Sequence, residues 1–181
     1  MNQVRIIGGQ WRRQLLRFPD SEALRPTPDR VRETLFNWLG QDLSGQRCLD
    51  LFAGSGALGF EAASRGAAQV VLVERAPRVL AALKDNARRL KCGTAVEIVG
   101  ADALKFAASC RQPFDVLFAD PPYRQGWLDR LEPLLPDLLA ADGALYLEAE
   151  MPVQALGAWK TVRQGQAGQV YFHLLRQEPK A

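Results

Sequence analysis

The tetrapeptide Asp120-Pro121-Pro122-Tyr123 carries the clearest chemical signal in this sequence. Its prolines stiffen the backbone and remove two N–H donors, which leaves a rim rich in acceptors. Asp120 and the carbonyl group of Pro121 can together accept both hydrogens of an –NH₂ group and so aim the nitrogen lone pair at a methyl donor. Such positioning can supply several of the roughly 7–11 kcal/mol available from orientation. We therefore predict a catalytic role for all four residues; the alternative is a rigid loop in which Tyr123 only packs.

Tyr123 has a second role in this hypothesis, because an aromatic ring beside the acceptors can stack on the base that carries the amine. Base–aromatic stacking is worth roughly 1–3 kcal/mol. Extracting a base from its stack costs a few kcal/mol, so the ring would offset much of that cost.

A glycine-rich loop precedes the tetrapeptide in the chain. Residues 54–59 fit the pattern G-x-G-x-x-G, in which glycines allow a tight turn and a close approach of the ligand. Glu74 follows at the spacing of a carboxylate that accepts ribose hydroxyls. By themselves, these features fit NAD and S-adenosylmethionine equally well.

Asp50 shifts the balance toward S-adenosylmethionine. It lies inside an apolar run, in the pattern Asp-x-Phe-x-Gly-x-Gly that also contains Phe52. A buried carboxylate needs cationic or hydrogen-bonding company, and it would repel a pyrophosphate but attract an ammonium or a sulfonium group. The structural alternative is a buried acid that accepts from the local backbone.

Asp102, in the run Gly100-Ala101-Asp102-Ala103, is placed to accept from an adenine amine. An N-cap for the next helix is a nearly equal interpretation, and one carboxylate can serve both purposes. We expect no metal. The predicted cofactor-binding residues are Asp50, Phe52, Gly54, Gly56, Glu74, Ala101, Asp102 and Ala103.

The elements that must position these residues alternate regularly. Helices are expected at 57–65 and 77–91, and buried strands at 47–53, 69–74, 95–99, 114–119 and 144–148. This alternation predicts an α/β fold with a mostly parallel sheet covered by helices on both faces. Expected strands at 159–163 and 169–176, joined by a glycine-bearing connection at 164–168, suit an antiparallel hairpin. By fold analogy, we expect the seven-stranded, Rossmann-like sheet of class I S-adenosylmethionine-dependent methyltransferases.

The first 45 residues form an extension to this core. Residues 4–18 are typical of a short strand or hairpin, and a helix is expected after Thr27 as its N-cap, with Pro28 at its first position and Gly40 at its end. We expect residues 1–45 to pack on a core of residues 46–181 within a single domain.

The extension is rich in arginine. Its first 32 residues contain seven arginines and no lysine. Arginine stacks on bases and binds phosphate bidentately, which suits structured RNA. The alternatives are an ordinary solvated face and, for Arg25 and Arg30, packing over the cofactor. The predicted RNA-binding residues are Arg5, Arg12, Arg13, Arg25, Arg30 and Arg32.

The composition is consistent with a cytoplasmic globular protein. The chain has 181 residues, 48% of them hydrophobic, and a net charge of +3. It lacks the apolar core of a signal peptide and any apolar run approaching the ~20 residues of a membrane span. The three cysteines show no Cys-x-x-Cys spacing, so we expect neither a disulfide framework nor a zinc site.

Five segments of the chain together resemble one known family, the bacterial RsmD-type 16S ribosomal RNA guanine-N2 methyltransferases. The most specific is Arg-Pro-Thr-Pro-Asp-Arg-Val-Arg-Glu at residues 25–33. The matching segments are residues 4–12, 25–39, 50–62, 120–123 and 167–170. The resemblance spans essentially the whole chain; many members carry Phe where this chain has Tyr123, and either ring can stack.

The resemblance implies S-adenosylmethionine-dependent N2-methylation of one guanine in 16S rRNA. Asp120 and Tyr123 would engage the guanine, while the glycine loop and the acids at 50, 74 and 102 would hold the cofactor. We expect a monomer that acts on rRNA within a small-subunit particle or its assembly intermediate, away from membranes.

Two other classes of function remain open. A DNA adenine-N6 methyltransferase also uses an Asp-Pro-Pro-Tyr rim, but this chain has no evident separate target-recognition domain. An NAD-dependent oxidoreductase or a non-catalytic nucleotide-binding module fits the glycine loop, but Asp50 and the tetrapeptide argue against both.

Overall fold

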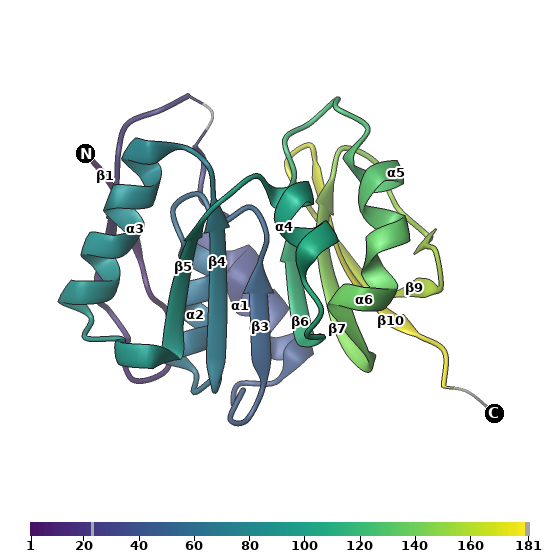
Figure 1. The fold of residues 1–181 in the computed structure, drawn as a ribbon, viewed down its shortest axis with the longest axis horizontal. Helices are drawn as coiled ribbons and strands as arrows, with labels where there is room; N and C mark the ends of the chain where they lie inside the picture. Colours follow the sequence, from purple (N-terminus) through teal and green to yellow (C-terminus); the bar gives the residue numbers. More distant parts are fainter. Residues whose placement is uncertain (23, 180–181) are drawn as a thin grey trace.

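A mixed β-sheet forms the centre of the molecule (Figure 1). Its parallel strands coincide with apolar runs of the sequence. The structure is a computed structural model that describes residues 1–22 and 24–179. The strands are β1 Asn2–Arg5, β2 Leu15–Phe18, β3 Arg47–Asp50, β4 Gln69–Glu74, β5 Val96–Gly100, β6 Phe114–Ala119, β7 Leu139–Ala149, β8 Ala155–Leu156, β9 Trp159–Ala167 and β10 Val170–Gln177. The helices are α1 Asp29–Leu39, α2 Ala57–Ser64, α3 Pro77–Arg89, α4 Ala103–Ser109, α5 Trp127–Leu131 and α6 Leu135–Leu138, with short 3₁₀ turns at Gly93–Ala95 and Glu132–Leu134.

The topology confirms the predicted fold class. The large sheet has the order β5-β4-β3-β6-β7-β10-β9-β8, in which β5 to β7 are parallel and β10 runs antiparallel between β7 and β9. It contains eight strands instead of the expected seven, because the two-residue β8 pairs with the outer edge of β9. β1 and β2 pair separately as an antiparallel hairpin.

The closing hairpin turns later than predicted. The connection expected at 164–168 belongs largely to β9, which continues to Ala167. Gly165 lies opposite Phe172 on β10, and a Cβ atom at Gly165 would come within 2.3 Å of the Phe172 ring. This glycine therefore makes room for an aromatic ring instead of forming the turn, which the sequence pattern does not distinguish.

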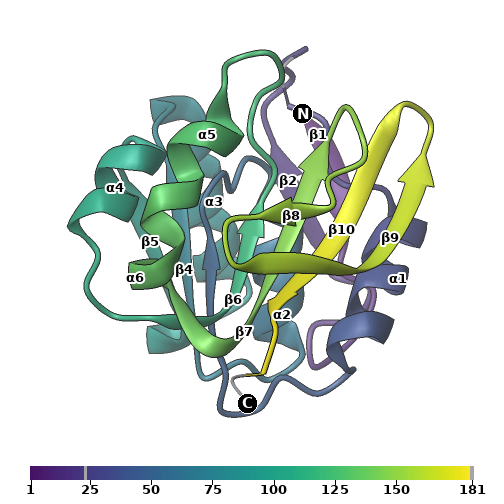
Figure 2. The ribbon, with the colours of Figure 1, turned by 90° about the vertical axis from the view of Figure 1, so that its right-hand side faces the viewer.

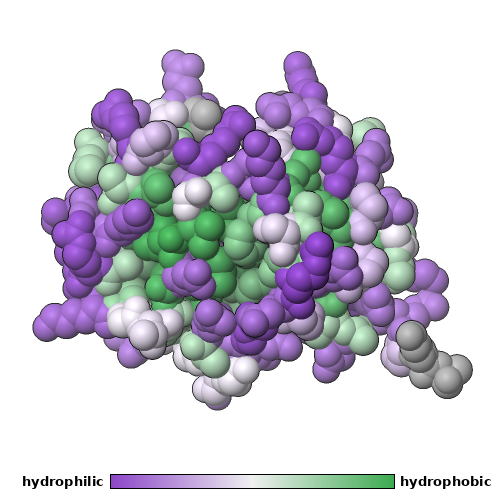
Figure 3. Space-filling view, in the orientation of Figure 1, coloured by the Kyte–Doolittle hydropathy of each residue, from purple (hydrophilic) through white to green (hydrophobic). Residues whose placement is uncertain are grey.

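Helices cover both faces of the sheet, with α4, α5 and α6 on one side and α1 on the other (Figure 2). One apolar cluster joins the β1–β2 hairpin, α1, α2 and α3 to one face, and a second cluster joins α4, α5 and α6 to the other. In Figure 3, hydrophobic residues gather between α3 and α4, surrounded by hydrophilic side chains. No helix in the described part of the chain is long and apolar enough to cross a membrane.

The start of α1 differs from the sequence prediction. Thr27 does not cap the helix: α1 begins at Asp29, Pro28 occupies the N-cap position, and no side-chain cap bond forms there. The Thr27 hydroxyl group instead donates to Glu148 Oε1 over 2.7 Å. The reason is tertiary, because the segment before α1 crosses the carboxyl edge of the sheet, where an acceptor on β7 competes for the hydroxyl.

Candidate active site

A cavity of about 760 Å³ opens at the carboxyl ends of the parallel strands. Its size lies within the range of small-molecule sites, and its position is where open α/β sheets bind ligands. Apart from Gly56, every residue predicted for the cofactor or for catalysis lines it, and Arg25 lies at the same cavity. These lining residues are Asp50, Phe52, Gly54, Glu74, Ala101, Asp102, Ala103, Asp120, Pro121, Pro122 and Tyr123.

The glycine loop turns sharply between β3 and α2. Gly54 and Gly56 have φ values of +52° and +81°, in the left-handed region that favours glycine. A Cβ atom at Gly56 would lie 2.6 Å from the Phe60 ring, so this glycine allows close packing below the loop. The Gly54 N–H donates to Glu74 Oε2 over 3.1 Å, which ties the loop to the end of β4.

Backbone N–H groups of neighbouring residues hold the Glu74 carboxylate. Its Oε1 accepts from the N–H groups of Arg75 and Ala76, both over 2.8 Å, while Oε2 accepts from Gly54. Two donors fill Oε1, so Oε2 retains the acceptor capacity that binding of a ribose hydroxyl would require.

Asp50 is the most deeply buried acid of the predicted cofactor set, with 3% of its surface exposed. It accepts the Gly59 N–H over 3.1 Å. Burial raises the pKa of Asp50 to about 7, with smaller contributions from the charges of Glu74 and Glu148. None of the ion pairs among residues 1–22 and 24–179 supplies it with a cation. A cationic ligand with N–H donors fits the buried Asp50 carboxylate, which is an acceptor, and a pyrophosphate does not.

Asp102 does cap a helix. Its Oδ1 accepts from the N–H groups of Leu104 and Lys105 over 3.0 and 3.1 Å at the start of α4. The residue also lines the cavity, so the two interpretations from the sequence remain compatible.

Two acids meet at the tetrapeptide end of the cavity, one predicted and one missed. Asp120 follows β6, and Glu148 lies on the adjacent parallel strand β7 with its carboxyl group hydrogen-bonded to that of Asp120. Thr27 and Tyr146 donate to Glu148 Oε1 over 2.7 and 2.8 Å. The available signal for Glu148 was a charged residue ending an apolar run at 144–148, next to the strand that carries Asp120.

The acid pair holds protons more tightly than isolated carboxyl groups. Burial raises the pKa of Asp120 well above its usual range, and the nearby charges of Glu148 and Asp50 raise it further. Burial also raises the pKa of Glu148. Two carboxyl groups within hydrogen-bond distance share a proton, because both cannot ionise cheaply so close together.

Tyr123 lies at the rim, with 45% of its surface exposed. Partial burial, and after it the charge of Asp120, raises the pKa of its phenol to about 12, so the ring stays neutral. An exposed neutral ring beside the acid pair is available for stacking.

The predicted RNA-binding arginines fall in different places. Arg25 lines the cavity, and the exposed Arg30 lies in the first turn of α1 nearby. Arg12 and Arg13 are exposed in the connection between β1 and β2, which packs on the end of α2 through hydrogen bonds to Ser64. Since α2 starts at the cavity and ends at Ser64, these two arginines lie at the opposite edge of the sheet.

Two other arginines of this set form ion pairs, and the prediction for Arg32 is wrong. Arg5 pairs with Asp29 over 2.8 Å and stays largely exposed. Arg32 is fully buried and pairs with Asp29 over 2.6 Å and with Glu61 over 3.2 Å. It lies on the face of α1 that turns toward α2, so its guanidinium group supports the fold and is closed to RNA.

Burial of Asp50 makes a prediction about stability. The pKa of Asp50 is about 7 in the folded state and about 4 in the unfolded chain, so between these values the folded protein holds a proton that the unfolded chain has released. The contribution of Asp50 to the free energy of unfolding is therefore highest below about pH 4 and falls as the pH rises through 7. The ligand-free protein should therefore melt at a lower temperature at pH 8 than at pH 5. Asp50→Asn should regain part of the loss at pH 8, on the order of 2–4 kcal/mol, yet bind S-adenosylhomocysteine poorly. Calorimetry measures the melting temperature, and calorimetric titration measures the affinity for S-adenosylhomocysteine. An Asp50→Asn variant that melts no higher than the parent at pH 8 would contradict the raised pKa of Asp50.

The sheet order, the sharp glycine loop after β3 and the buried Asp50 beside it are those of the class I methyltransferases. A family model described as "Conserved hypothetical protein 95" matches residues 4–176. The chain belongs to this family, which it shares with the ribosomal RNA small subunit methyltransferase D proteins.

The relatives of the chain extend along nearly its whole length. Ribosomal RNA small subunit methyltransferase D of Escherichia coli K12 is 46% identical over 182 residues, covering 97% of this chain and 91% of the relative. The Haemophilus influenzae protein of the same name is 40% identical over 179 residues, covering 95% and 93%. The solved structure of Escherichia coli yhhF has a TM-score of 0.87 at 42% identity, with 99% and 100% coverage. A Salinibacter ruber RNA methyltransferase in complex with S-adenosylhomocysteine shares the fold, with a TM-score of 0.65 at 19% identity.

Proposed function

We propose that this protein transfers a methyl group from S-adenosylmethionine to the N2 amine of one guanine in small-subunit rRNA. The observation that carries the proposal is the cavity in which the acceptor rim of Asp120 and Pro121 lies near the buried, cation-free Asp50. The names of the relatives support rRNA as the substrate. We further expect a cytoplasmic monomer that acts on a small-subunit particle or assembly intermediate.

The residues of the chain divide the work between two ends of the cavity. When bound, S-adenosylmethionine supplies an electrophilic methyl group. Asp50, Glu74 and Asp102 would hold its ammonium, ribose and adenine groups, each carboxylate being oriented by backbone N–H donors. Asp120 and the carbonyl group of Pro121 would accept both amine hydrogens and orient the nitrogen for in-line attack. Tyr123 would stack on the extracted base.

The direct test is tritiated methyl transfer to small subunits that lack the modification, followed by nucleoside analysis. We expect N2-methylguanosine at one position of the rRNA. Labelled N6-methyladenosine would instead identify an adenine methyltransferase. Calorimetry with S-adenosylhomocysteine and NAD separates the remaining class, since preference for NAD would refute methyl transfer.

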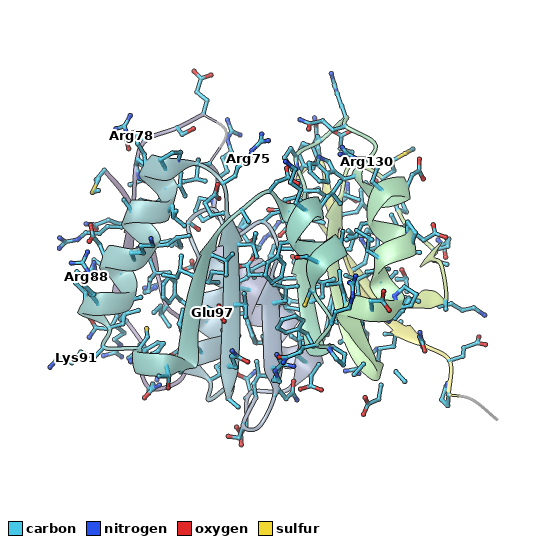
Figure 4. The ribbon with its side chains drawn as sticks, viewed as in Figure 1. Arg75, Arg78, Arg88, Lys91, Glu97 and Arg130 are labelled. Atoms are coloured by element: carbon cyan, nitrogen blue, oxygen red, sulfur yellow. The ribbon has the colours of Figure 1, made fainter. Side chains whose placement is uncertain are left out.

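We infer that the RNA-binding surface continues along α3. Arg75 lines the cavity, and Arg78, Arg88 and Lys91 project from α3 or its end (Figure 4). The β1–β2 hairpin contacts the same helix, where the Arg17 backbone and Asn86 exchange two hydrogen bonds. Cations on α3 therefore bridge the distance between Arg25 at the cavity and Arg12 at the far edge, a path suited to an RNA backbone.

Single arginine changes should reveal this surface through salt dependence. We expect Arg12→Ala or Arg30→Ala to weaken RNA binding and to reduce the slope of log K against log salt by roughly 0.7–0.9 per lost phosphate contact. Filter binding to small-subunit rRNA over a salt series measures the slope. Arg111→Ala, an exposed arginine between α4 and β6, is the charge-matched control. Equal slopes for all three variants and the parent would remove the amino-terminal segment from the RNA-binding surface.

A further inference from the structure

Glu148 has no task in the amine-binding scheme, although it lies at the centre of the site. Asp120 and the Pro121 carbonyl group already suffice for the two hydrogens of an amine. Yet Glu148 lines the cavity, is hydrogen-bonded to Asp120, and keeps only 7% of its surface exposed. A buried acid without a cation costs stability, so its presence calls for a ligand that supplies donors.

The carboxyl group of Glu148 is also held in a fixed orientation. Thr27, in the segment before α1, and Tyr146, on β7 itself, both donate to Oε1. The Glu148 carboxylate is thus an acceptor fixed from two sides next to Asp120. A fixed acceptor can recognise a ligand donor at a defined position, which a mobile, solvated carboxylate cannot do.

We propose that Glu148 selects the target base: it accepts the N1–H of guanine while Asp120 and Pro121 accept the hydrogens of the neighbouring N2 amine. Guanine carries these donors side by side on its Watson–Crick edge. Adenine has a lone pair at N1, which would face the Glu148 carboxylate without a proton between them. An unpaired acceptor in a buried site is strongly disfavoured, so the pair would reject adenine. This inference rests on the proposed function and names the residue that gives it base specificity.

The pair also accounts for the proton that methylation releases. As the methyl carbon bonds to N2 and its bond to the donor sulfur breaks, the N2 proton passes to the carboxylate of Asp120, which then shares it with Glu148. The products are the methylated base, a neutral thioether and an acid pair with one proton. That protonation state is the one that the burial of both groups favours.

A base analogue gives a specific test. 2-Aminopurine retains the 2-amino group but has a lone pair at N1 and lacks O6. Comparing the two bases in the parent and in Glu148→Gln isolates the contact at N1, because the substitution leaves any contact to O6 unchanged. The analogue is built into the rRNA at the position that nucleoside mapping identifies, and kcat/KM is compared with that for guanine. We expect the parent protein to prefer guanine by about 10- to 100-fold. In Glu148→Gln the Thr27 and Tyr146 hydroxyl groups hold the amide oxygen at the position of Oε1, so the NH₂ group takes the place of Oε2. That group opposes N1–H of guanine and donates to N1 of the analogue, so the preference should vanish or reverse.

Controls separate recognition from folding. Tyr146→Phe removes one donor to Glu148 but keeps the carboxylate, so it should retain the preference for guanine. Melting temperature and S-adenosylhomocysteine affinity verify that each variant is folded. An unchanged ratio of the two bases in Glu148→Gln would overturn the proposal. Failure of the proposed function looks different, because the parent protein would then form no N2-methylguanosine at all.

The pH profile gives a readout that a structural role would not move. Guanine binding needs both acids ionised, so kcat/KM should rise with pH through their raised pKa values. Glu148→Gln removes the like charge that raises the pKa of Asp120, so the acidic limb should move to lower pH. An acidic limb that stays in place would contradict the assignment. The other groups that face the pair are Asp50 on β3, Thr27 before α1, Tyr123 after β6 and Tyr146 on β7.

Discussion

Asp120→Ala is expected to reduce methyl transfer to small-subunit RNA by at least about 10²–10³-fold, the usual effect of removing one preorganised hydrogen-bonding group at the reacting centre. The Pro121 carbonyl group alone can accept one amine hydrogen but cannot fix the direction of the lone pair. S-adenosylhomocysteine should still bind, because Asp50, Glu74 and Asp102 hold the other end of the cavity through separate backbone contacts.

Single-turnover rates and calorimetric titration measure the two effects separately. Asp120→Asn is the matched variant, because its amide keeps one acceptor oxygen in the same place and should keep part of the activity that alanine loses. Full activity of Asp120→Ala would refute the assigned role. Loss of S-adenosylhomocysteine binding in both variants would mean that Asp120 belongs to the cofactor site instead.

Glu61→Ala should lower the free energy of unfolding more than any other substitution proposed for this protein. Glu61 is fully buried in α2, and its oxygens accept from the Ile7 and Gly8 N–H groups over 2.9 and 2.8 Å. It also pairs with Arg32 over 3.2 Å and with Arg65 over 3.0 Å. Its removal breaks both of these buried ion pairs and leaves Arg32 with Asp29 alone, and breaking a buried pair by removing one partner typically costs about 3–5 kcal/mol.

For a domain of this size, that cost lowers the melting temperature by roughly 6–20 °C. Hydrogen exchange should quicken first at Ile7 and Gly8, because Glu61 attaches the hairpin to α2. Glu97→Ala, on the exposed edge strand β5, is the control and should stay within about 0.5 kcal/mol of the parent. A Glu61 variant that melts like this control would disprove the structural role.

Local patterns in the sequence predicted the core of the fold and most of the cavity. The glycine loop and Asp102 each follow a recognisable strand and Glu74 ends one, and parallel strands bring their carboxyl ends to one edge of a sheet. Asp120 and Tyr123 follow β6 in the same way. These residues meet in one cavity because strand order and direction alone suffice to gather them.

The sequence could not predict contacts between surfaces that are distant in the chain. Thr27 has the features of an N-cap, and only the packing of its segment against β7 gives the hydroxyl group to Glu148. Arg32 resembles its exposed neighbours, and only the approach of α2 buries it against Glu61.

The segment Asp120-Pro121-Pro122-Tyr123 depends on local sequence for its own acceptors and on tertiary packing for its partner Glu148. Local sequence predicted the fold class, which the sheet topology confirms, and it also predicted a cofactor loop and an amine-binding rim. Each of these depends on neighbouring residues and on strand periodicity. Packing between distant segments places Glu148 beside Asp120 and divides the amino-terminal arginines between a buried network and the surface, and local sequence does not reveal either result. Those outcomes depend on which faces meet across the sheet, and burial there sets both the pKa of the acids and the partners of the cations.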